Sequence, residues 1–167
     1  MKYLVSLLII TALFSQAKEI PKNQLIIDAE QFEAHDTKGL SIFTGNVKMT
    51  RVKDKLDSDM LEVYMTPLKK GASKQKRVVL KYIAIGNVSF DIFTKDKHYK
   101  GRGEKVIYSP TILEYEIIGK GSIQELTEDK TLIGERIILN QTTGESKVSG
   151  SKNKPVRFIM QIESKEK

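Results

Sequence analysis

A short glycine-centred phrase recurs along the chain and limits how it can fold. The phrase reads FTGNVKM at residues 43–49, AIGNVSF at 84–90 and, less closely, IIGKGSI at 117–123. A glycine next to an asparagine often marks a turn, yet here apolar residues run up to both sides of the pair. A glycine inside a strand usually marks a bend, a bulge or a close approach of two backbones. Repeated in one phase, the three glycines predict a corner at which each strand passes from one sheet to another.

A second phrase follows each glycine and completes a repeating unit. It reads DMLEVY at residues 59–64, GEKVIY at 103–108 and GERIIL at 134–139. Partial copies stand at both ends, since IIDAEQF places Asp28 like Asp59, and VSG at 148–150 precedes a last strand. Imperfect repeats with truncated ends are typical of a stacked, quasi-one-dimensional architecture.

Strand signals fill the chain after its first residues. Segments rich in Ile, Val, Leu, Tyr and Phe alternate with Gly and Asn. The clearest segments are 23–30, 61–65, 77–86, 88–93, 105–109, 112–119, 135–140 and 156–163. Residues 28–36 are the one stretch that suggests a turn of helix. With 167 residues, 40% of them hydrophobic and no Trp, we expect one domain with an aliphatic core.

Side chains after each corner alternate between apolar and polar. Val47 and Val88 share one parity, whereas Lys48 and Ser89 share the other, which we assign to solvent. The pattern predicts an all-β fold, in which antiparallel strands in imperfect repeats form an open-ended, twisted β-jelly roll. The residues expected to line its interior, which is both core and groove, are Leu25, Ile27, Phe43, Val47, Met49, Val88, Phe90, Ile92, Tyr108 and Ile123.

Residues 1–17 differ from the rest of the chain. They hold a lysine at position 2, an apolar run from residue 4 to residue 14, and then Ser15, Gln16 and Ala17. This is the pattern of a secretory signal peptide with a small-x-small cleavage site. The apolar run is short for a spanning helix, which needs about 20 residues. We therefore expect a signal peptide over 1–17 and a single domain over 18–167, with an uncleaved anchor as the alternative.

Charge and cysteine content narrow the possible partners. The chain has no cysteine, which excludes disulfides and thiolate metal sites. A formal net charge of +7 favours anionic partners, and export makes nucleic acid the weakest of them. The basic segment KKGASKQKR, residues 69–77, is either a contact for lipid phosphate or an acidic partner, or simply a solvated connection.

Residues that could support catalysis or metal binding are scattered. His35 and His98 each stand alone between charged residues, and both are expected to be exposed. Asp57 and Asp59 lack the further oxygen ligands and the spacing of a calcium loop. No serine or cysteine is combined with histidine in a nucleophilic arrangement. We therefore expect neither an enzyme nor a cofactor or metal site.

Taken together, these phrases resemble the OstA-like, or LptA-like, family of lipopolysaccharide transport proteins. The resemblance rests on FTGNVKMTRVKDKLDSDMLEVYM, GNVSFDIF with GRGEKVIY, GERIILNQTTGESKVSG, and the opening strand LIIDAEQFE. It covers roughly Leu25 to Phe158. The chain departs from the family in exchanging Asp and Ala in the opening strand and in reducing the third glycine phrase to GKGSI.

The resemblance implies a periplasmic protein of Gram-negative bacteria that carries lipopolysaccharide from the inner to the outer membrane. Acyl chains would lie in the apolar groove. The N-terminal edge would meet an inner-membrane-anchored LptC-like protein, the C-terminal edge an LptD-like outer-membrane barrel, and copies would stack head to tail. Two alternatives stay open: a membrane-anchored LptC-like component with the same fold, and a structural β-solenoid adaptor that binds no lipid.

Overall fold

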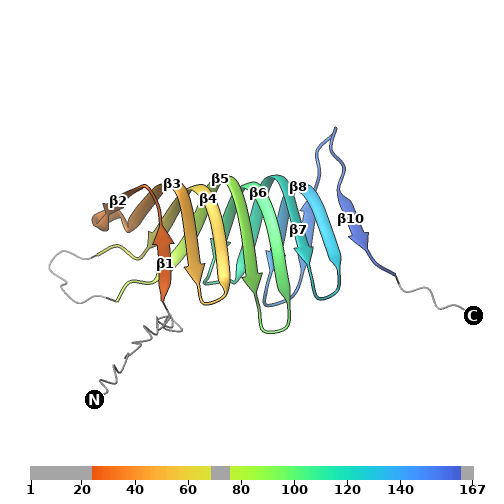
Figure 1. Ribbon diagram of the computed structural model, residues 1–167, viewed down its shortest axis with the longest axis horizontal. Helices are drawn as coiled ribbons and strands as arrows, with labels where there is room; N and C mark the ends of the chain where they lie inside the picture. Colours follow the sequence, from red (N-terminus) through yellow and green to blue (C-terminus); the bar gives the residue numbers. More distant parts are fainter. Residues whose placement is uncertain (1–23, 69–75, 163–167) are drawn as a thin grey trace, which may run out of the picture.

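The computed structural model describes residues 24–68 and 76–162, which form one long, bent sheet (Figure 1). Its elements are β1 (Leu25–Asp28), β2 (Gln31–His35), the 3-10 helix η1 (Asp36–Lys38), β3 (Leu40–Arg51), β4 (Asp54–Met65), β5 (Val79–Phe93), β6 (His98–Ser109), β7 (Glu114–Glu125), β8 (Lys130–Asn140), β9 (Ser146–Ser149) and β10 (Arg157–Met160). The predicted signal peptide and residues 69–75 of the basic segment lie outside the described residues. In the part described, no helix has the length and apolar character needed to cross a membrane.

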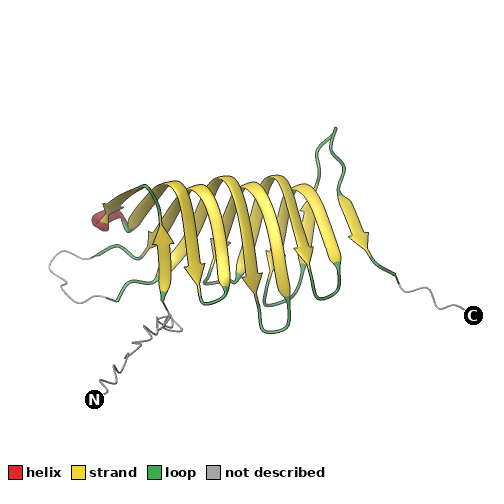
Figure 2. Cartoon of the chain, in the orientation of Figure 1, coloured by secondary structure: helices red, strands yellow, loops and turns green. Residues whose placement is uncertain are grey.

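Antiparallel strands join the sheet almost in the order of the chain. The order is β1-β3-β4-β5-β6-β7-β8-β10, with β2 also beside β3 and β9 also beside β8. Because each hairpin adds to the end of the stack, β1 and β10 lie at opposite ends of the described structure (Figure 1). The strands cross the long axis, and their turns collect along the margins (Figure 2). The predicted all-β jelly roll, open rather than closed, is confirmed.

The long strands β3, β5 and β7 each bend at a glycine, as the sequence predicts. Shifts of register interrupt the strand pairing around Gly45, Gly86 and Gly119. At each shift two successive residues have positive φ, as in Gly86 at 79° and Asn87 at 46°. Such a pair forms a bulge that bends a strand without ending it. The strands therefore run through the corner as single elements of up to 15 residues, longer than the predicted segments.

A carboxylate from a neighbouring segment covers each corner glycine. A Cβ built on Gly86 would lie 2.3 Å from Oδ2 of Asp59, so no side chain fits there. The same Asp59 oxygen accepts a hydrogen bond from Nδ2 of Asn87 at 2.9 Å. Equivalent contacts join Glu30 to Gly45 and Glu104 to Gly119. The corner is therefore a three-part unit of glycine, left-handed neighbour and covering carboxylate.

This contact corrects the phase of the predicted repeat. Asp59 is equivalent to Glu104 rather than to Gly103, because Leu61 and Val106 both pair with Ala84 and so share one row of the sheet. The first unit is shifted by one residue against the second. The sequence pattern did not reveal this shift, because the apolar residues of DMLEVY and GEKVIY align equally well with and without a one-residue offset.

The start of the chain also differs from the prediction. Of residues 28–36, where a helical turn was suggested, 31–35 form β2, and only Asp36 is helical, as the first residue of η1. Glu30, between β1 and β2, takes the corner position that was predicted for Asp28. Asp28 pairs with Lys48 instead. The pairing of β2 with β3 overrides a weak local preference for helix.

The two sides of the corner form two layers that face each other. Layer A comprises residues 47–51, 54–58, 88–93, 98–103, 121–125 and 130–134 with β1 and β10. Layer B comprises residues 40–44, 60–65, 79–85, 105–109, 114–118 and 136–140 with β2 and β9. Apolar side chains fill the space between them, and Leu61, Ile117 and Ile137 are fully buried there. We call this space the trough, and the side opposite the corners its mouth.

Candidate functional site

Two rows of apolar residues, one from each layer, line the floor of the trough. The row from layer A is Ile27, Met49, Leu56, Phe90, Gly101, Ile123, Leu132 and Phe158. The row from layer B is Phe43, Leu61, Ala84, Val106, Ile117, Ile137 and Val148. Successive members of each row are partners on neighbouring strands. The floor is therefore an apolar strip that continues along the whole stack of long strands.

All ten residues predicted to lie inside belong to this interior. Val47, Val88, Phe90, Ile92 and Ile123 are buried, and Leu25, Ile27, Phe43, Met49 and Tyr108 are partly buried against them. Lys48 and Ser89, which have the opposite parity, are exposed. The predicted inward parity is therefore correct.

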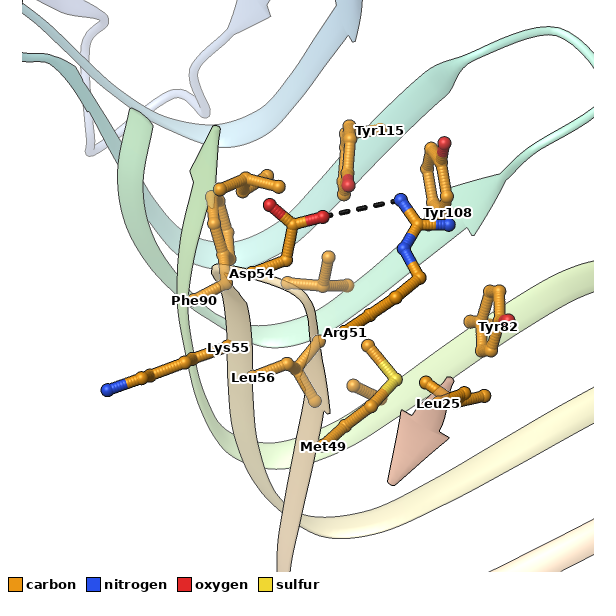
Figure 3. Close-up of a pocket in the computed structure, with 13 residues that line it drawn as sticks. Leu25, Met49, Arg51, Asp54, Lys55, Leu56, Tyr82, Phe90, Tyr108 and Tyr115 are labelled. Atoms are coloured by element: carbon orange, nitrogen blue, oxygen red, sulfur yellow. Dashed lines mark hydrogen bonds and ion pairs between the residues drawn. The ribbon is translucent and has the colours of Figure 1, made fainter. Parts of the chain in front are cut away.

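Three tyrosines close the mouth in the N-terminal half of the trough (Figure 3). Tyr82, Tyr108 and Tyr115 are successive partners along layer B. Ring centroids are 4.2 Å apart for Tyr108 and Tyr115, and 6.1 Å apart for Tyr82 and Tyr108. Phe90 of layer A stacks on Tyr115 at 6.1 Å. A cavity of only about 40 Å³ remains beside them, so this half is filled by its own side chains.

An ion pair from layer A lies beside these tyrosines (Figure 3). Arg51 and Asp54 flank the turn between β3 and β4, with Nη2 3.3 Å from Oδ2. Asp54 also accepts a hydrogen bond from the backbone N–H of Phe93 at 2.9 Å. Burial disfavours the charge of Arg51, but the hydrogen bond and charge of Asp54 outweigh burial and raise the pKa of Arg51. A charged guanidinium therefore stands at the edge of an apolar cavity.

Burial raises the pKa of all three tyrosines, most of all that of Tyr115. The charge of Arg51 acts in the opposite direction on each phenol but does not cancel the effect of burial. The phenols are therefore neutral at physiological pH. They present hydroxyl groups that can donate or accept hydrogen bonds at the mouth.

The C-terminal half of the trough holds a larger cavity, of about 300 Å³. Residues that line it include Lys97, Ile123, Glu125, Lys130, Leu132 and Leu139. The row that carries the tyrosines continues here as Leu139 and Ser146, so no aromatic ring from layer B covers the mouth. One trough is therefore filled at one end and open at the other.

Several lining residues escaped the sequence prediction. They are Arg51, Asp54, Leu56, Leu61, Tyr82, Val106, Tyr115, Ile117, Glu125, Ile137 and Leu139. The alternation of side chains does predict an inward position for Arg51, because it shares the parity of Val47 and Met49. A charged residue in an alternating strand is, however, ordinarily assigned to solvent. The tyrosine cluster depends on the register that sets Tyr115 beside Tyr108, and that register does not follow from the sequence.

The histidines lie apart from the trough. Within residues 24–68 and 76–162, no three His, Cys, Asp or Glu side chains are grouped so that they could hold a metal ion. His98, predicted to be exposed, is half-buried: its ring stacks on Phe93 at 4.0 Å, and its Nε2 lies 2.5 Å from Oδ1 of Asp91. Nε2 of His35 lies 3.7 Å from Glu33. His98 therefore ties β6 to β5 at their shared turn.

The fold and the trough define a class of protein, an antiparallel jelly roll that is open at both ends and has an apolar interior along its length. A comparison with known protein families matches residues 26–145 to the family described as LptA/(LptD N-terminal domain) LPS transport protein. The chain belongs to this family. The resemblance seen in the repeated glycine phrases is confirmed.

A solved structure shares the fold. It is the crystal structure of LptH, the LptA homologous periplasmic component of the conserved lipopolysaccharide transport device from Pseudomonas aeruginosa. The two structures align with a TM-score of 0.66 at 15% sequence identity, over 84% of this chain and 96% of that one. At this identity the likeness establishes the fold. Curated protein sequences give no match to the chain.

Proposed function

We propose that this protein is a periplasmic bridge that carries lipopolysaccharide from the inner to the outer membrane, with the acyl chains sheltered in the trough. The observation that supports this most directly is the continuous apolar floor. Each methylene removed from water contributes about 0.8 kcal/mol, so a strip of this length offsets much of the cost of exposing several chains. Membership of a family of lipopolysaccharide transport proteins supports the same role.

In this proposal the acyl chains enter through the mouth and lie on the floor rows, among them Met49, Phe90 and Ile123. The C-terminal half already has room. The N-terminal half must widen, because the stacked rings of Tyr108 and Tyr115 fill it. Cationic side chains at the mouth, Arg51 and Lys97 among them, are placed to meet phosphate groups that stay outside the floor.

The two ends of the sheet suit partners that add a strand. In the described part of the chain, β1 and β2 pair only with β3, and β9 and β10 only with β8. Phe158, Ile159 and Met160 of β10 are all exposed. Unpaired edges invite a further strand. We therefore assign the N-terminal edge to an inner-membrane-anchored LptC-like protein and the C-terminal edge to an LptD-like barrel, with head-to-tail stacking of copies and export by a signal peptide over residues 1–17.

Photo-crosslinking at single positions tests the trough. A photoreactive residue at Phe90 or Val47, both buried on the inward face, should form adducts with lipopolysaccharide in cells. The same residue at Ser89, which is adjacent to Phe90 and faces solvent, is the matched control. Adducts at Ser89 but at neither interior position would contradict the proposal.

Two measurements separate the proposed bridge from its alternatives. Mass spectrometry of the native N-terminus distinguishes an exported protein cut after Ala17 from a membrane-anchored LptC-like component. Extraction of lipid from protein purified from the cell envelope distinguishes a carrier from a structural adaptor. A carrier should release lipopolysaccharide in proportion to protein, whereas an adaptor should release none.

A further inference from the structure

Glu125 is a buried carboxylate with one oxygen unused. Its side chain is only 8% exposed. Oε1 accepts hydrogen bonds from the backbone N–H groups of Thr127 at 2.9 Å and Glu128 at 3.3 Å, and so holds the turn after β7. Oε2 is buried and has no hydrogen-bond partner in the described structure. A buried acceptor without a donor is costly, which marks this oxygen as a place for an incoming N–H or O–H group.

Glu125, which carries the unused oxygen, is one of the residues that line the 300 Å³ cavity in the C-terminal half of the trough. Nζ of Lys97 lies 3.6 Å from Oε2, beyond hydrogen-bond distance, and also meets Glu128 at 3.3 Å. Lys130 pairs with Glu128 as well. The two lysines and two glutamates balance in charge, so the group has no net charge to attract a simple anion or a simple cation.

A ligand group that fits this setting carries both charges. An ammonium would donate to Oε2 of Glu125, and an adjoining phosphate would meet Lys97 and Lys130 as a charge-assisted pair. The apolar walls, Ile123, Leu132 and Leu139, suit a hydrocarbon chain attached to that phosphate. We propose that the C-terminal half of the trough binds the head group of a zwitterionic, primary-amine-bearing amphiphile of the phosphoethanolamine type, with Glu125 as the residue that recognises the amine.

The inference rests on the proposed function in one respect, since it takes an amphiphile as the ligand of the trough. To the proposed binding of lipid it adds a preference for one kind of head group in the C-terminal half of the trough. A matched pair of probes separates the two claims: an alkyl phosphoethanolamine and an alkyl phosphocholine of equal chain length, both below their micelle concentrations. The probes share chain and phosphate, but the trimethylated choline has no N–H to donate.

Titration calorimetry of the whole exported chain with each probe gives the test. We expect the phosphoethanolamine probe to bind about tenfold more tightly than the phosphocholine probe, which is the ratio that about 1.4 kcal/mol produces. In Glu125→Gln this ratio should fall to about one while phosphocholine affinity is retained. Because a glutamine Oε1 still accepts from Thr127 and Glu128, the turn should stay folded. Glu104→Gln, at an exposed corner, should leave the ratio unchanged.

Equal affinity for the two probes in the native protein would overturn the head-group inference and leave the apolar trough intact as a lipid site. A preference that survives in Glu125→Gln would also overturn it. Failure of both probes to bind would overturn it and count against the proposed function as well. Ser146→Leu, which introduces a larger side chain into the lining of the cavity, should weaken both probes, and unchanged binding would place them elsewhere.

Discussion

The two halves of the trough share one floor but differ at the mouth. In the N-terminal half, Tyr82, Tyr108 and Tyr115 pack over a residual cavity of about 40 Å³. In the C-terminal half, the same row continues with Leu139 and Ser146, and the cavity is about 300 Å³. The floor must be apolar wherever the layers meet, whereas the mouth row is free to vary. A repeat of this kind can therefore build a closed section and an open section from the same backbone.

The largest expected contrast comes from truncating one leucine in each half. Leu61→Ala removes a fully buried side chain from the closed half and should lower the free energy of unfolding by about 2–5 kcal/mol. Leu132→Ala removes a partly buried side chain that already borders a cavity, and should cost roughly 1 kcal/mol. Denaturant unfolding of both variants measures the difference. Equal losses would show that the halves are packed equally well.

Enlarging one side chain in each half should also distinguish the halves. A Cβ on Gly101 would lie 2.1 Å from Cζ of Phe90, so Gly101→Ala must displace the ring that stacks on Tyr115. Overpacking of this kind costs about 1–3 kcal/mol. Ser146→Val, at the open half, should change stability by less than about 0.5 kcal/mol. If thermal unfolding shows that Gly101→Ala leaves stability unchanged, the closed half is not more tightly packed than the open half.

Alkaline pH should weaken the closed half through its phenols. Burial raises the pKa of Tyr115 in the folded state, whereas an unfolded tyrosine titrates near about 10. Below that pH both states hold the proton and the stabilisation is complete. Above it only the unfolded chain loses the proton, so this one phenol should lower stability by about 1.4 kcal/mol per pH unit.

Tyr115→Phe should flatten this fall, which unfolding curves at several pH values above 9.5 would measure. Tyr99 lines the cavity of the open half. Burial also raises its pKa, but by less, so Tyr99→Phe should flatten the fall less. An unchanged slope in Tyr115→Phe would mean that other groups govern alkaline unfolding.

The smallest effect is expected from the charges at the mouth. The Arg51 side chain is 44% exposed, and an ion pair with that much solvent contributes at most about 1 kcal/mol. Arg51→Met should therefore lower stability by less than that, and Lys130→Met, in the open half, should do so by a similar amount. Calorimetric unfolding would measure both. A loss above about 2 kcal/mol in Arg51→Met would mean that the ion pair, rather than the floor, holds the closed half together.

The sequence predicted the features that repeat, but not the features that depend on register. The corners at Gly45, Gly86 and Gly119 and the inward parity of Val47 and Val88 follow from local pattern, because bulges need glycine and strands alternate. The phase of Asp59 did not follow, since a two-residue bulge changes which residues face each other. Arg51 and Glu125 were assigned to no interior role because their inward position depends on neighbours that close over them.

The covering carboxylates at the corners have a consequence for the width of the trough. Glu30, Asp59 and Glu104 lie on the outside of the bend, away from the floor rows. The bulge that bends each of these strands is therefore held by contacts on the outside of the corner, such as the hydrogen bond from Asn87 to Asp59. The width of the trough and the identity of the residues that line it are separate properties of this fold. A substitution at the outer corner could therefore change the width of the trough without altering any residue of the floor rows.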